Sequence, residues 1–92
     1  MTLEMVERQA EAERLRIQDI KDKMRVLELM EDTLSAAGVY TFLRLDNNGE
    51  LVIIKFLASD KPDKVVNVHM DNPMAMLVDI FRQAGTDLLA EA

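Results

Sequence analysis

The first 37 residues of this 92-residue chain contain neither glycine nor proline, the two residues that most strongly interrupt an α-helix. Thr2 can cap the N-terminus of a helix, and Gly38 can adopt the left-handed conformation that ends one. We therefore predict one long helix in residues 1–37, running from Leu3 to Ala37. It would be roughly 52 Å long, whereas residues 39–92 would form a body only about 26 Å across. About half of the helix should then protrude as an arm.

Apolar residues recur along this helix at alternating spacings of three and four, the heptad pattern of a helix that pairs with another helix. Eight of the ten positions are apolar, and the exceptions are Glu13 and Glu31. The ten positions, which we call the seam, are Leu3, Val6, Ala10, Glu13, Ile17, Ile20, Met24, Leu27, Glu31 and Leu34. A seam exposed on a protruding arm would mark an interface. The residues predicted to form it are Leu3, Val6, Ala10, Ile17, Ile20 and Met24.

The two halves of the predicted helix differ in character. Between Glu4 and Lys23 the surface opposite the seam is almost wholly charged, and Asp19 is placed to pair with Lys23. After Met24 the apolar stripe widens, as expected of a helix that packs on a sheet. The added residues are Val26, Leu29, Met30, Ala36 and Ala37. We therefore assign the C-terminal half of the helix to the body.

Two β-rich runs follow, on either side of Asn48-Gly49, a pair typical of a type I′ hairpin turn. A two-residue loop pairs Asn47 with Glu50 and separates the side chains into two faces. One face carries Thr41, Leu43, Leu45, Val52, Ile54 and Phe56. The other carries Tyr40, Phe42, Arg44, Ile53, Lys55 and Leu57. A three-residue loop would mix these two sets, so the assignment depends on the loop length.

The rest of the chain predicts a third strand and a second helix. Residues 65–70 alternate, with Val66, Val68 and Met70 expected inward and with Asn67 and His69 expected outward. Asn72 and Pro73 suit the start of a helix that continues, straight or kinked, through Gly85 to about Ala90. Its apolar residues at helical spacing are Met74, Leu77, Ile80, Phe81 and Ala84. The predicted architecture is an α+β fold in the order α-β-β-β-α, with a three-stranded antiparallel meander in a single domain of residues 1–92.

Charge and composition exclude several classes of function. Seventeen acidic and eleven basic residues give a net charge of −6, which argues against direct binding of nucleic acid or of an anionic membrane. The chain has no cysteine, no apolar run long enough to span a membrane and no recognisable targeting signal. We therefore expect a cytoplasmic protein.

The sequence also offers little for catalysis or metal binding. His69 is the only histidine, and Asp71 two residues later could orient it, but no suitable nucleophile accompanies them. The residues around Gly49 lack the acidic first position of a calcium loop, because Arg44 stands there. The acids near His69, namely Asp60, Asp63 and Asp71, are interpreted as solvated surface charge. We expect a protein without enzymatic activity, cofactor or metal.

The chain contains seven methionines, which could lie in the hydrophobic core or form a binding surface. Methionine commonly fills irregular gaps in a core, and that is the interpretation we favour over an adaptable binding groove. The residues concerned are Met24, Met30, Met70, Met74 and Met76.

Three functional hypotheses follow. The first is a non-enzymatic interaction protein that self-associates through its first helix, most simply as a dimer. The second is a phage-type acidic inhibitor of a basic nucleic-acid-binding or defence protein. Its weakness is that the charge is dispersed, with −3 in residues 1–32 and −3 in the remainder. The third is a protein that sequesters a small molecule at an oligomer interface, on a surface formed by Tyr40, Phe42, Ile53 and Leu57.

The sequence leaves the orientation of paired helices open. In a parallel pair Lys23 would face Glu28 favourably, but Arg16 would face Lys21 unfavourably. Glu13 within the seam also disfavours a long uninterrupted coiled coil.

Overall fold

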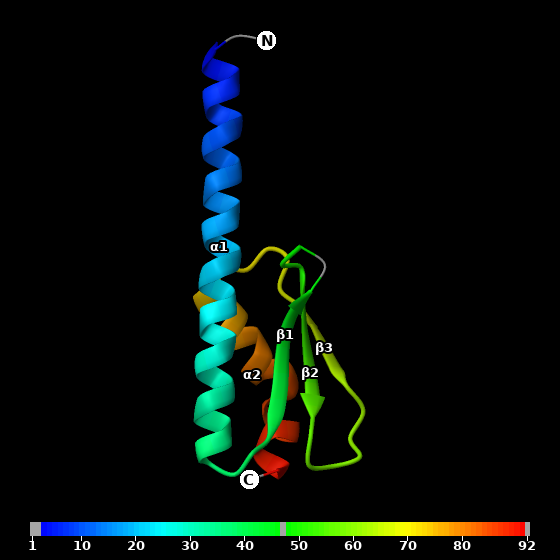
Figure 1. The fold of residues 1–92 in the computed structure, drawn as a ribbon. Helices are drawn as coiled ribbons and strands as arrows, with labels where there is room; N and C mark the ends of the chain where they lie inside the picture. The colour runs from blue at the N-terminus through cyan, green and yellow to red at the C-terminus, as the bar shows by residue number, and fades with distance from the viewer. Residues whose placement is uncertain (1–2, 47, 92) are drawn as a thin grey trace.

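A computed structural model describes residues 3–46 and 48–91 of the chain, and it contains two helices and three strands (Figure 1). In chain order the elements are α1 (Leu3–Ala36), β1 (Thr41–Asp46), β2 (Leu51–Phe56), β3 (Lys64–Asn67) and α2 (Pro73–Ala90). The strands form one antiparallel sheet in the order β1-β2-β3. The predicted α-β-β-β-α order and the α+β class are therefore confirmed.

The two helices lie on one face of the sheet. α1 packs against β1 and α2, and α2 packs against β3. Only the C-terminal half of α1 takes part, and the N-terminal half extends beyond the body as an arm (Figure 1). The resulting molecule measures 55 × 21 × 18 Å. Its long dimension is set by α1, because the body itself is much shorter.

α1 ends at Ala36, one residue before the predicted position, because the backbone turns at Gly38. Gly38 has a φ of +83°, and the N–H of Val39 donates to the carbonyl oxygen of Leu34 at 2.8 Å. This hydrogen bond closes the last turn of the helix. It also brings Val39 into the core, so the chain enters β1 directly.

The hairpin between β1 and β2 has the predicted register. Thr41 lies opposite Phe56, Leu43 opposite Ile54 and Leu45 opposite Val52. Asn48 and Gly49 have φ values of 55° and 86°, the positive pair that a type I′ turn requires. Asn47 lies outside the described residues, and so does its predicted pairing with Glu50.

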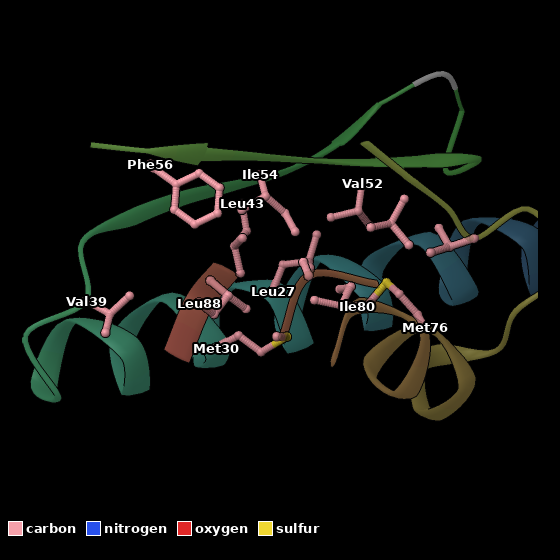
Figure 2. Close-up of a cluster of buried hydrophobic side chains, with 13 residues drawn as sticks. Leu27, Met30, Val39, Leu43, Val52, Ile54, Phe56, Met76, Ile80 and Leu88 are labelled. Atoms are coloured by element: carbon pink, nitrogen blue, oxygen red, sulfur yellow. The ribbon is translucent and has the colours of Figure 1, made fainter. Parts of the chain in front are cut away.

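The hydrophobic core lies between the sheet and the two helices (Figure 2). The sheet contributes the side chains of one face, including Leu43 and Ile54. The helices contribute side chains from the C-terminal half of α1 and along α2. The buried apolar residues are Leu27, Met30, Val39, Leu43, Val52, Ile54, Phe56, Val66, Val68, Met76, Ile80, Ala84 and Leu88. The face carrying Leu43, Val52, Ile54 and Phe56 is therefore the core face.

α2 buries only part of the row of side chains that the sequence predicts, since Ile80 and Ala84 are buried as predicted and others are not. Asn72 caps the helix, since its side-chain oxygen accepts a hydrogen bond from the N–H of Ala75 at 2.8 Å, and the helix is continuous through Gly85 as expected. Its buried residues are Met76, Ile80, Ala84, Gly85 and Leu88. Most of them form an i, i+4 row, which is the row that faces the sheet. Met74 and Phe81 lie on other faces and are exposed, and Leu77 is half-buried.

Three methionines predicted to be in the core are exposed instead. Met70 is 89% exposed because β3 ends at Asn67, and the N–H of Asp71 then donates to the carbonyl of Val68 in a turn. Met24 and Met74 are exposed on α1 and α2. The widened stripe of α1 is likewise only partly buried, because Leu29, Ala36 and Ala37 are exposed.

Candidate functional site: the surface of the arm and its neighbours

The arm is the part of α1 from Leu3 to about Gln18. Apart from Glu4, whose side chain is not described, every residue in this range is exposed. Burial begins at Asp19 and Ile20, which are half-buried, and is complete at Lys23 and Leu27. The boundary between arm and body therefore lies close to Ile20.

The predicted interface residues divide between the arm and this boundary. Leu3 is 75% exposed, and Val6 and Ile17 are each 46% exposed. Ala10 is also exposed, and Ile20 lies against the hairpin turn near Gly49. Met24 is exposed beside the body. Together these residues form an apolar line that continues from the free end of the arm to the body.

Polar side chains of the arm make short-range contacts along the same helix. Arg14 pairs with Glu11 and Arg16 pairs with Glu13, each at 3.8 Å, and the side chains in both pairs are more than half exposed. Such exposed pairs stabilise a helix by only about 0.2–0.5 kcal/mol. They leave the charged groups of the arm able to exchange partners at little cost.

Lys23 is a buried residue that sequence reasoning places in solvent. Its side chain is 3% exposed, and its ammonium lies 3.1 Å from a carboxylate oxygen of Asp19 and donates to the carbonyl oxygen of Val68 at 3.3 Å. The i, i+4 spacing predicts the pair with Asp19. The contact with Val68 cannot be predicted in this way, because it depends on how the loop after β3 approaches α1. Lys23 therefore fastens that loop to α1.

Asp71 lies near Lys23 and does not orient His69 as the sequence suggested it could. Burial, a side-chain hydrogen bond with Asp79 and the charge of Asp79 raise the pKa of Asp71, while Lys23 opposes the rise. Among the described residues, one carboxylate oxygen of Asp71 is buried without a hydrogen-bond partner. His69 instead faces Glu50, with 3.7 Å between its Nδ1 and a carboxylate oxygen. Asp71 and His69 therefore belong to separate contacts.

Polar residues at the base of the arm line a hollow of about 380 Å³. The lining residues are Arg16, Asp19, Lys23, Asn48, Gly49, Glu50 and His69. Both signs of charge are present, and Lys23 is already bonded to Asp19. Among the described residues, no group of three or more His, Asp or Glu side chains is placed to hold a metal ion.

A second hollow, of about 370 Å³, lies between α1 and α2. It is lined by Val26, Leu29, Met30, Thr33, Leu34, Leu77 and Phe81. The hydroxyl of Thr33 donates to the carbonyl of Leu29 at 2.8 Å, so the most polar side chain of the groove is already bonded. Sequence patterns do not reveal this groove, because its residues come from the edges of two apolar stripes.

The sheet face away from the helices carries the other predicted partner surface. Tyr40, Phe42 and Leu57 are exposed, and Ile53 is half-buried. These residues share the face with Arg44 and Lys55, as the register predicted. None of the four lines the groove between α1 and α2.

A side chain of α1 contacts the backbone of β1. The backbone N–H of Leu43 donates to the carboxylate of Glu31. Glu31 is one of the two charged residues of the seam, and this contact gives it a structural role. Glu13, the other, lies on the exposed arm.

Comparison with protein-family models, curated proteins and solved structures finds no match to this chain. Within the part of the chain that the structure describes, no helix combines the length and the apolar character needed to cross a membrane.

Proposed function

We propose that this chain is a small acidic interaction protein, without enzymatic activity, that self-associates through the arm of α1. The observation that carries the proposal is the position of the seam. Leu3, Val6 and Ile17 are exposed on a helix that extends beyond its own body. An isolated helical arm is marginal in water, and its stability in proteins comes mainly from packing an apolar face. A second copy supplies that packing.

Burial of the seam supports an association of moderate strength. Four large apolar side chains per copy, at Leu3, Val6, Ile17 and Ile20, would be covered, so a dimer covers eight, each contributing about 1–1.5 kcal/mol beyond its present burial. Association itself costs roughly 4–15 kcal/mol. We therefore expect a dissociation constant in about the micromolar range or weaker. A cytoplasmic location remains part of this proposal.

The test is the absolute mass in solution, measured by light scattering after gel filtration over a hundredfold range of concentration. The wild-type protein should change from monomer to dimer across this range. The variant V6E/I17E should stay monomeric because it places two carboxylates in the seam. Ile20 is left unchanged, because it contacts the hairpin turn and its replacement would also disturb the fold.

A matched control is available on the same helix. Met5 and Leu15 are 51% and 62% exposed and lie outside the seam. The variant M5E/L15E also introduces two glutamates and should dimerise like the wild type. A wild-type monomer at every concentration, or equal loss of the dimer in both variants, would overturn self-association through the seam.

A further inference from the structure

Two successive segments of α1, residues 3–13 and residues 14–25, carry net charges of opposite sign. Residues 3–13 contain four glutamates and one arginine, a net charge of −3. Residues 14–25 contain five lysines or arginines and two aspartates, a net charge of +3. Of this second segment, residues 14–20 lie in the part of α1 up to Ile20, and they contain two arginines and one aspartate, a net charge of +1. Two arms laid in opposite directions bring acidic residues beside basic ones, whereas two arms laid in the same direction bring like charges together.

The residue types of the seam are also arranged symmetrically about its centre. If two arms run antiparallel with the centre between Glu11 and Ala12, Leu3 of each copy meets Ile20 of the other. Val6 then meets Ile17, and the small Ala10 meets Glu13. Large apolar residues pack at both ends of such a pair, and each Glu13 faces a methyl group. A parallel pair would place the two Glu13 carboxylates opposite each other in one layer.

Flanking charges favour the same direction. In the antiparallel pair Glu7, which follows Val6, lies beside Arg14 of the second copy, and the twofold symmetry repeats the contact. Arg14 makes an exposed contact with Glu11 at 3.8 Å, so it can exchange partners. The parallel pair loses its one favourable contact, Lys23 with Glu28, because Lys23 is buried against Asp19 and Val68. It keeps the repulsion between Arg16 and Lys21.

We propose that the arms of two copies pair antiparallel over Leu3–Ile20, with Leu3 against Ile20 and Val6 against Ile17. The inference rests on the self-association proposed above and specifies its direction and register. The overlap ends where burial of α1 in its own body begins, so no core contact has to open. The two bodies then lie at opposite ends of a rod, with about 74 Å between the C-terminal ends of the two α1 helices. Each body presents its sheet face and its groove separately.

Cysteine cross-linking can test the direction directly, because the chain has no cysteine of its own. V6C and I17C are prepared separately, one of them with a small tag, and mixed in a thiol redox buffer at a concentration where the wild type is dimeric. The antiparallel register predicts that the mixed disulfide, which joins a V6C chain to an I17C chain, exceeds each homodimeric disulfide at least tenfold. L15C, outside the seam, serves as the control for random collision.

The outcomes separate the two proposals. Dominant disulfides between identical positions would show a parallel pair, which would overturn the antiparallel register while leaving self-association intact. Cross-linking of V6C and I17C no faster than that of L15C, with a wild-type dimer in light scattering, would place the interface elsewhere. Cross-linking at the L15C rate together with a wild-type monomer would overturn both proposals.

Discussion

At the scale of single residues, Gly49 and Gly85 should respond in opposite ways to the same substitution. Gly85 lies inside α2, where an added Cβ would make an ordinary contact with Phe81 at 3.9 Å. G85A should therefore raise the free energy of unfolding by about 1 kcal/mol, the difference in helix propensity. Gly49 has a φ of +86°, and a Cβ there would lie 3.1 Å from Cγ1 of Ile20.

G49A should consequently lower the free energy of unfolding, by about 1–2 kcal/mol. Urea denaturation followed by circular dichroism measures both changes, at a protein concentration low enough for the monomer to predominate. A destabilised G85A would mean that α2 needs its glycine for a closer approach than the structure shows.

The raised pKa of Asp71 predicts a pH dependence with a definite sign. A carboxyl group whose pKa is higher in the folded state binds protons more tightly there, so its contribution to stability falls as the pH rises above the unfolded-state value of 3.8. D71N removes this cost and can donate to Asp79. We expect a higher Tm for D71N than for the wild type at pH 7, and a smaller difference near pH 3.

Thermal unfolding at both pH values measures this difference. D63N is the matched control, because Asp63 is exposed and its contact with Lys55, at 3.8 Å, is between half-exposed side chains. D63N should not raise the Tm at pH 7. A lower Tm of D71N at pH 7 would instead show that the attraction between Asp71 and Lys23 outweighs burial and the repulsion from Asp79.

Two of the residues that sequence reasoning places wrongly share a cause. Lys23 and Met70 are assigned by their positions in a periodic pattern, but their environments depend on the loop after β3. That loop crosses to α1, where the carbonyl oxygen of Val68 accepts a hydrogen bond from the buried Lys23. The same loop leaves Met70 exposed. Periodicity describes one element at a time, so it cannot show a contact between a loop and a distant helix.

At the scale of the elements, local signals are sufficient for the boundaries of both helices and of the hairpin, but not for the end of β3 or for every face. The Asn48-Gly49 pair sets the hairpin register, and the alternation along β1 and β2 then assigns both faces correctly. α2 is more ambiguous because apolar residues occupy more than one of its faces. Which row is buried depends on how the helix crosses the sheet, and the remaining apolar residues Leu77 and Phe81 line the groove with α1.

Glu13 tests whether the seam is a packing surface. If it lies in an interface, replacing it with leucine removes two partly desolvated carboxylates per dimer and adds apolar contact. E13L should then lower the dissociation constant of the dimer at least tenfold, which corresponds to about 1.4 kcal/mol. Sedimentation equilibrium can measure the change. E11L is the control, since Glu11 is exposed on another face of the helix, and an equal effect of both substitutions would argue against the seam.

At the scale of the whole molecule, an exchange of charges can distinguish a specific pair of arms from simple hydrophobic association. E7R and R14E should each weaken the antiparallel dimer about fivefold, because each creates two contacts between like charges. The double variant E7R/R14E restores opposite charges and should recover most of the affinity. Measuring the dissociation constants at low and at high salt provides a check, since the differences should shrink as salt screens the charges. Failure of the double variant to recover would contradict the contact between Glu7 and Arg14.

The shape of the assembly provides a separate measurement. One copy is 55 Å long, and a parallel pair would have about that length because its bodies lie side by side. The antiparallel pair separates the bodies, with about 74 Å between the C-terminal ends of the two α1 helices. Small-angle X-ray scattering should therefore show a maximum dimension of at least about 75 Å for the wild-type dimer. For the monomeric variant V6E/I17E the maximum dimension should be close to 55 Å. A wild-type dimer no longer than the monomeric variant would exclude the rod, since side-by-side bodies cannot arise from arms that run in opposite directions.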